Sequence, residues 1–236
     1  MRILQKKVDG IIVIGTYLRD YYHKNKNLII VPPLVDLKEE KWHFQKEEKK
    51  NGETVFVYSG SGSKIKDKTN YVIEALSELD EKMPFKFNVI GVTKDEYVSS
   101  YPELKDSIEK LGTKIYFFGK VSHEESIKAV GNADYCVFFR PLTRKNKAGF
   151  PTKFAESISC GTPVITSEVS DLGQYIKNGE NGIFFDIKNP ESIMKGIKRI
   201  AVDKNFIPPY VDENLFHYEK YNAILSKWLD QIFFDN

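Results

Sequence analysis

The chain has 236 residues, of which 41% are hydrophobic and 29% are charged. This composition is typical of a soluble globular protein and excludes a disordered chain, and the length allows one or two domains with a sizeable core. The 35 basic and 33 acidic side chains give a formal net charge of +2. Such a balance provides no bulk electrostatic field that would favour nucleic acid as a partner.

Cysteine content and hydropathy bear on the compartment. Cys136 and Cys160 have neither metal-ligand nor redox spacing, so we expect two free buried thiols, which favours the cytoplasm. We find no signal peptide and no run of about 18 apolar residues, so we expect no membrane-spanning segment. Aromatic and basic side chains are plentiful, which leaves peripheral association with the inner face of a membrane open. We expect neither a metal nor a cofactor.

Short apolar runs alternate with longer amphipathic stretches, which predicts repeated βα units and a Rossmann-like parallel sheet flanked by helices. The expected strands are Gly10–Ile14, Leu28–Val31, Thr54–Tyr58, Phe85–Ile90, Ile115–Phe118, Tyr135–Phe139, Pro163–Thr166 and Ile183–Phe185. The expected helices are Tyr17–Lys24, Thr69–Glu81, Asp95–Leu111, Glu124–Val130, Thr152–Cys160, Leu172–Lys177, Ser192–Asp203 and Asn214–Ile232. A charged stretch over 36–54 indicates a linker, which is followed by one continuous α/β region over 55–190.

The segment 149–167, GFPTKFAESISCGTPVITS, is the most informative part of the chain. Pro151 suits the first turn of a helix, and Gly161 suits the position just past its end. Free N–H groups at Thr152 and Lys153 would attract phosphate, and Glu156 would lie roughly 6 Å further along the axis, within reach of ribose hydroxyls. The pattern therefore predicts a nucleoside diphosphate site. The alternative is an ordinary helix-to-strand unit with a surface Lys and Glu.

This segment resembles the donor-site signature of retaining glycosyltransferases with the GT-B fold, the glycosyltransferase group 1 family. Residues 31–36, 55–76 and 114–139 resemble further segments of that family in the same order, so the similarity covers most of residues 10–230. The resemblance implies three parts of the chain. They are 1–50, the tail of an N-terminal GT-B domain and a linker; 51–210, a nucleotide-sugar-binding Rossmann-like domain; and 211–236, a helix returning toward the N-terminal domain.

The resemblance also implies roles for individual residues. Glu156 is expected to hold the donor ribose, and Lys153 is expected to neutralise charge on the leaving nucleotide, which makes these two the catalytic candidates. The other expected substrate-binding residues are Gly60, Ser61, Gly62, Lys64, Lys66, Gly119, Lys120, Val121, Phe150, Pro151 and Thr152.

Three positions qualify this assignment. The chain lacks the Arg that the family places after its first glycine, so the choice among Lys64, Lys66 and Lys68 stays open. Ala148 stands where the common family pattern has a Glu, which affects the donor sugar more than the nucleotide. His123 begins a helix, and we do not expect it to act in catalysis.

Together these features predict a fragment of a retaining, metal-independent hexosyltransferase. It would bind a nucleotide-diphosphate sugar for transfer to a polysaccharide or glycolipid acceptor held by a missing N-terminal domain, and would be inactive as an isolated chain. The alternative is a non-catalytic nucleotide-sugar-binding subunit or regulatory module of the same fold. A dehydrogenase-type dinucleotide binder is disfavoured because no G-x-G-x-x-G follows the first strand.

Overall fold

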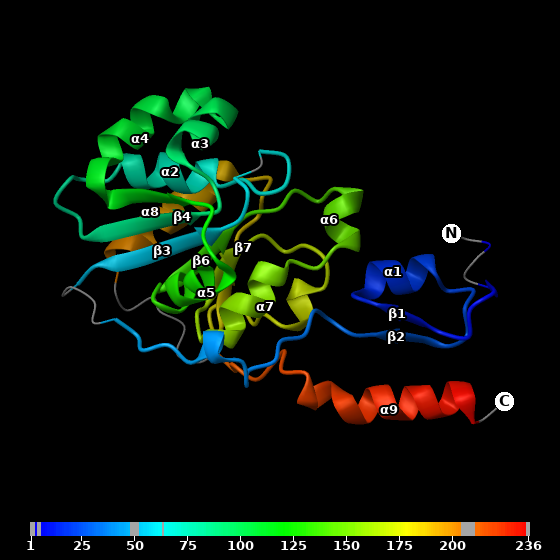
Figure 1. Cartoon of the computed structure of the whole chain (residues 1–236). Coiled ribbons are helices and arrows are strands. Elements are labelled where there is room, and N and C mark those ends of the chain that lie inside the picture. Colours follow the sequence, from blue (N-terminus) through cyan, green and yellow to red (C-terminus); the bar gives the residue numbers. More distant parts are fainter. Residues whose placement is uncertain (1–2, 4–5, 48–51, 63, 204–210, 235–236) are drawn as a thin grey trace.

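The computed structural model describes residue 3 and residues 6–47, 52–62, 64–203 and 211–234. Its main body is a six-stranded parallel sheet with helices on both faces, which confirms the expected fold class (Figure 1). The strands are β3 (Thr54–Ser59), β4 (Phe85–Ile90), β5 (Ile115–Gly119), β6 (Tyr135–Phe138), β7 (Val164–Thr166) and β8 (Gly182–Phe184).

The strand order is β5-β4-β3-β6-β7-β8. The chain runs outward from β3 to β5 and then returns to place β6 on the other side of β3. This reversal creates a topological switch point, and in open parallel sheets ligands bind beyond the carboxyl ends of the strands at such a point. The fold therefore directs attention to the segments that follow β3 and β6.

Helices cover both faces of the sheet and bury its strands. The helix α2 (Asn70–Ser77) packs against α8 (Pro190–Val202) and α4 (Lys105–Leu111), and α3 (Lys94–Ser100) lies nearby. The opposite face carries α5 (His123–Gly131) and α7 (Thr152–Ser159). Phe56, Val57 and Tyr58 in the central strand are fully buried between the two helical layers.

The N-terminal part forms a separate small unit. Here β1 (Ile11–Val13) and β2 (Leu28–Ile30) pair in parallel and are connected through α1 (Thr16–Tyr21). The long C-terminal helix α9 (Glu219–Phe233) runs beside this unit (Figure 1). The contact is close, since a Cβ atom on Gly10 would lie 2.5 Å from Cδ1 of Ile232.

The expected elements are found in order, with three corrections. The helix expected over Asp95–Leu111 is interrupted, because Pro102 disfavours helical geometry at Tyr101, whose φ and ψ are −133° and 67°. The segment expected as a helix from Leu172 is only a short 3-10 turn, η5 (Leu172–Gln174). An unexpected helix, α6 (Arg144–Ala148), begins where the side chain of Thr143 accepts a hydrogen bond from the Asn146 N–H.

Some boundaries also differ from expectation. The last helix begins at Glu219 rather than at Asn214, and α2 ends at Ser77. Short 3-10 turns complete the structure, namely η2 (Glu40–Trp42), η3 (Pro102–Leu104) and η4 (Gly112–Lys114). None of the helices in the described ranges is long and apolar enough to cross a membrane.

Phe216, in the segment before α9, packs against three aromatic rings of the main domain. We name these four rings the aromatic cluster. The ring centroid of Phe216 lies 5.4 Å from that of Phe154 in α7, 5.2 Å from that of Tyr175 and 5.8 Å from that of Phe150. The planes of these ring pairs are tilted or nearly perpendicular to one another, which is the arrangement that aromatic quadrupoles favour. The C-terminal segment is therefore part of the core rather than an appendage.

We predict that Phe216→Ala lowers the free energy of unfolding by about 3–5 kcal/mol, because it opens a cavity in this aromatic cluster. Urea denaturation measures the change. The control is Phe233→Ala, since Phe233 is 67% exposed and should change stability by less than about 0.5 kcal/mol. Equal effects of the two substitutions would contradict the packing role of Phe216.

Candidate functional site

The switch point of the sheet brings together the loop after β3, the segment after β6 and the start of α7. Gly60 and Gly62 lie in the first of these, Arg140 in the second, and Thr152 and Lys153 in the third. Their proximity is direct, since a Cβ atom on Gly60 would lie 2.8 Å from Nζ of Lys153. The predicted phosphate loop and the predicted phosphate lysine thus meet at one edge of the sheet.

Lys153 lies beneath the loop rather than on an open surface. Its side chain is 9% exposed, its Nζ atom lies 2.8 Å from Oδ2 of Asp67, and it sits 4.1 Å above the ring of Tyr58. A cation at this position is expected from the sequence, but the sequence does not indicate a protein partner for it. The ion pair with Asp67 is a finding of the structure.

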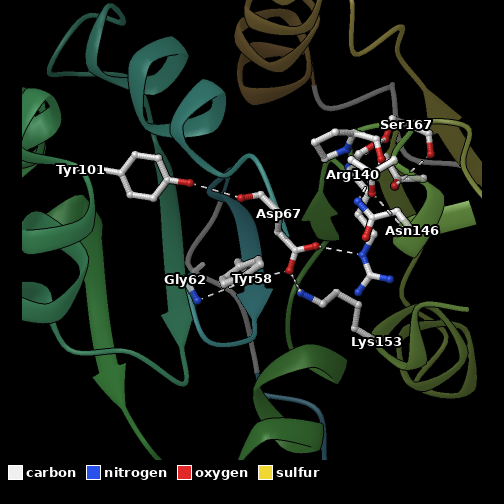
Figure 2. Close-up of polar contacts among 11 residues, drawn as sticks. Tyr58, Gly62, Asp67, Tyr101, Arg140, Asn146, Lys153 and Ser167 are labelled. Carbon is white, nitrogen blue, oxygen red and sulfur yellow. Dashed lines mark hydrogen bonds and ion pairs between the residues drawn. The ribbon is translucent and has the colours of Figure 1, made fainter. Parts of the chain in front are cut away.

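Asp67 is the centre of a buried polar network (Figure 2). Its Oδ1 atom accepts a hydrogen bond from Nε of Arg140 at 2.9 Å, and Oδ2 accepts one from the Tyr58 hydroxyl at 3.0 Å in addition to the Lys153 contact. The Tyr101 hydroxyl donates a hydrogen bond to the backbone carbonyl of Asp67 at 3.2 Å. We name Asp67, Arg140 and Lys153 the buried charge cluster.

The cluster holds two cations and one carboxylate, which determines the ionisation of its members. Burial opposes ionisation of Asp67, but the charges and hydrogen bonds of Lys153 and Arg140 outweigh burial and keep the pKa of this carboxyl below its ordinary value. Burial lowers the pKa of Lys153, which Asp67 counteracts and the charge of Arg140 reinforces. Burial, together with the nearby Asp67 charge, raises the pKa of Tyr58, so its hydroxyl stays protonated and donates.

Arg140 is held by hydrogen bonds at its backbone. Its N–H donates to Oγ of Ser167 at 2.8 Å, and the Ser167 hydroxyl donates back to the Arg140 carbonyl at 2.9 Å. The Asn146 side chain donates to the Pro141 carbonyl at 2.9 Å and so fixes the next residue (Figure 2). Arg140 was not among the residues predicted from the sequence, although it closely follows a buried strand, at the edge of the sheet where ligands bind.

The two glycines of the first loop permit close packing but do not offer free amides. The Gly60 N–H donates to the Ile90 carbonyl at 2.9 Å, and the Gly62 N–H donates to the Tyr58 hydroxyl at 3.2 Å. Gly62 has a φ of +63°, which a side chain would strain. Both glycines therefore shape the loop over Lys153, and any phosphate contact falls to other groups.

The three lysines of the loop after β3, which are Lys64, Lys66 and Lys68, differ in exposure and in their protein partners. Lys64 pairs with Glu103, with 2.6 Å between Nζ and Oε1, and lies over the Tyr101 ring. Lys66 and Ser61 are exposed, and Lys68 donates its backbone N–H to the Phe139 carbonyl at 2.7 Å. Lys64 thus has a protein partner at the loop surface, whereas the buried charge of this edge comes from Lys153 and Arg140.

Glu156 lines a cavity and pairs with a residue outside the buried charge cluster. Its side chain is 25% exposed, and Oε1 lies 3.2 Å from Nε2 of His123 at the start of α5. With Thr152, Trp42 and Asp36 these two residues line a cavity of about 180 Å³ between α7 and the segment that precedes β3. One short helix, α7, thus presents Glu156 to a cavity and Lys153 to the charge cluster.

The remaining predicted residues fall into two groups. Phe150 and Pro151 are buried, and the Phe150 ring packs in the aromatic cluster. These contacts support a structural role for Phe150. Gly119 ends β5 with its N–H donating to the Val92 carbonyl at 3.2 Å, and Lys120 beside it is exposed. Val121 lines a different cavity, of about 260 Å³, together with Phe118 and Lys128.

Among the residues that the structure describes, no three His, Cys, Asp or Glu side chains are placed to hold a metal ion. Cys136 and Cys160 are both free and buried, as expected from their spacing.

We predict that Asp67→Asn lowers the free energy of unfolding at pH 7 by about 3–5 kcal/mol, because two buried cations lose their counter-charge. The folded pKa of Asp67 lies below its unfolded value of about 3.9. Its stabilisation is therefore present above that value and is lost as the pH falls through the folded pKa. Urea unfolding should show the wild-type advantage shrinking below about pH 4. Glu103→Gln, in an exposed ion pair, is the control, and a pH-independent difference for Asp67→Asn would contradict the assignment.

Comparison with known proteins matches residues 39–209 to the family described as glycosyl transferases group 1. An uncharacterised glycosyltransferase of Methanocaldococcus jannaschii is 31% identical over 159 residues, which cover 64% of this chain and 37% of that protein. A second uncharacterised glycosyltransferase of the same organism is 25% identical over 151 residues, with the same two coverages. The chain thus matches well under half the length of these relatives.

Solved structures share the fold at low sequence identity. Sucrose-phosphate synthase from Thermosynechococcus elongatus has a TM-score of 0.70 and 18% identity, covering 100% of this chain and 61% of that one. HepE from Anabaena, in complex with UDP and glucose, has a TM-score of 0.70 and 13% identity, covering 94% of this chain and 63% of that one. The family match and these GT-B neighbours confirm the resemblance seen in the sequence, and the chain belongs to the group 1 glycosyltransferase family.

Proposed function

We propose that the chain binds the nucleoside diphosphate of a nucleotide-sugar donor at the carboxyl edge of its six-stranded sheet. The observation that carries this proposal is the placement of Glu156 and Lys153 within one turn of α7. Glu156 lines a cavity, and Lys153 belongs to the buried charge cluster. A site for a ribose diol beside a site for a diphosphate is what this ligand requires.

Glu156 is the group proposed to bind the ribose. A carboxylate accepts two hydrogen bonds from a vicinal diol, and charge-assisted bonds of this kind are stronger than neutral ones. His123 contacts the same carboxylate and so orients it toward the cavity. Anabaena HepE, a protein of the same fold, has been solved with UDP and glucose, which supports a nucleotide donor.

Lys153 and the first turn of α7 are proposed to face the diphosphate. Thr152 is exposed and begins α7, at the positive end of the helix dipole, and the next residue is Lys153. Positive charge placed here would stabilise the negative charge that grows on a leaving nucleotide. This electrostatic role fits the retaining, metal-independent hexosyl transfer that we propose.

The acceptor and the cellular setting belong to the same proposal. We propose transfer to a polysaccharide or lipid-linked acceptor at the inner face of the membrane, with the acceptor held by a part of the enzyme that the chain does not contain. The isolated chain then transfers no sugar. The alternative, a non-catalytic binding subunit of the same fold, is favoured by Ala148, which offers no carboxylate to the donor sugar.

We predict saturable binding of UDP or GDP to the isolated chain in the presence of a chelator, measured by calorimetry with ADP as a third ligand. Glu156→Gln should weaken that binding by about 1–3 kcal/mol, because it removes a charge-assisted hydrogen bond to the ribose. The loss should vanish for the same nucleotide lacking both ribose hydroxyls.

The matched control for this substitution is Glu124→Gln, since Glu124 is an exposed carboxylate on α5. It should leave nucleotide affinity unchanged. Absence of saturable binding to all three nucleotides would refute the proposed function. Equal weakening of normal and deoxygenated nucleotides by Glu156→Gln would refute the ribose role alone.

A further inference from the structure

We propose that Arg140 is a second phosphate-binding residue of this site, and that Asp67 is the positioning residue that holds Arg140 and Lys153 together to receive one anionic group. The inference rests on the proposed function and deepens it by naming a cation that the sequence motifs do not contain. Three observations carry it, namely unused donors, unbalanced charge and a fixed backbone.

The donors of Arg140 are only partly used. Arg140 is 4% exposed, and its Nε donates to Asp67. Within the part of the chain that the structure describes, neither terminal Nη atom of Arg140 has a hydrogen-bond acceptor. The Arg140 side chain is 5% exposed, and its Nη atoms are not among the fully buried polar atoms of the described residues that lack a partner. These N–H groups therefore keep a narrow contact with solvent, where an anionic group could accept from them.

Lys153 shows the same surplus. Its ammonium contacts the Asp67 carboxylate and the face of the Tyr58 ring, and no other oxygen of the described residues accepts from it. An ammonium and a guanidinium together carry many more N–H donors than one carboxylate can accept. The two side chains keep small exposed fractions, 5% for Arg140 and 9% for Lys153, so both remain within reach of a ligand.

The charge of the cluster is unbalanced in the same direction. Burying a charge without a partner is costly, and here two cations share a single carboxylate. The second cation contributes to the lowered pKa of Lys153, after the larger effect of burial. A bound phosphate group would supply the missing negative charge at the place where it is most stabilising.

Arginine is suited to bridge the two partners. Its planar guanidinium can bind the Asp67 carboxylate through Nε while the terminal nitrogens face a phosphate, whereas a lysine presents a single point charge. Ser167 and Asn146 fix the backbone on either side of this residue. Arg140 is therefore held in place before any ligand arrives, which keeps the ordering cost of binding low.

The test measures affinities for UDP, uridine and inorganic pyrophosphate with Arg140→Gln. We expect affinity for UDP and pyrophosphate to fall by about tenfold or more, as for loss of a charged hydrogen bond, with uridine unaffected. The matched control is Arg144→Gln, which removes the same charge from an exposed position four residues away and should change each affinity less than about twofold.

Two further measurements cover a variant that fails to fold. Arg140→Lys keeps the buried charge and should bind pyrophosphate with intermediate affinity. In the wild-type chain with ¹⁵N-labelled arginine, pyrophosphate should shift the side-chain resonances of Arg140 and leave those of Arg144 in place.

Unchanged UDP and pyrophosphate affinity in a folded Arg140→Gln variant would overturn the proposal, as would unshifted Arg140 resonances at saturating pyrophosphate. If pyrophosphate binds through Arg140 but no nucleotide binds, the proposed function fails while the anion site stands. If nucleotides bind and Arg140 is indifferent to them, the proposed function stands and this inference fails. A chain that binds neither pyrophosphate nor any nucleotide would refute both.

Discussion

The geometry of the carboxyl edge depends on one carboxylate, that of Asp67. It joins the loop after β3, the end of β6 and the start of α7 through contacts of 2.8 to 3.0 Å with Lys153, Arg140 and Tyr58. A buried ion pair loses several kcal/mol when one partner is removed, so these segments cannot separate without a large cost. The groups proposed to bind the ligand are therefore the same groups that hold this edge of the sheet together.

The short helix α7 divides the site into two parts with different physical character. Glu156 lies beside His123 in a cavity of about 180 Å³, where its carboxylate could accept hydrogen bonds from hydroxyl groups. Lys153 instead belongs to the buried charge cluster, in which two cations share one carboxylate. This division matches the proposed ligand, which has hydroxyl groups at one end and anionic phosphates at the other.

Much of the fold could be predicted because its signals are local. Buried parallel strands give short apolar runs, and Pro151 and Gly161 mark the ends of α7 closely. The interruption at Tyr101 was predictable in principle from Pro102, whereas α6 is too short to show a period. The Asp67–Arg140 pair joins residues 73 positions apart, and the local sequence around either residue does not indicate that the two are in contact. The burial of Lys153 and the internal use of the Gly62 amide likewise depend on tertiary packing.

The central claim is that the buried charge cluster and Glu156 together bind a nucleoside diphosphate, and a crystal structure of the chain with UDP tests it most directly. The account predicts diphosphate oxygens within hydrogen-bonding distance of the Arg140 guanidinium and the Lys153 ammonium, and ribose hydroxyls on the Glu156 carboxylate. A diphosphate bound instead at the exposed lysines of the first loop, away from Arg140 and Lys153, with no ribose hydroxyl on Glu156, would contradict it.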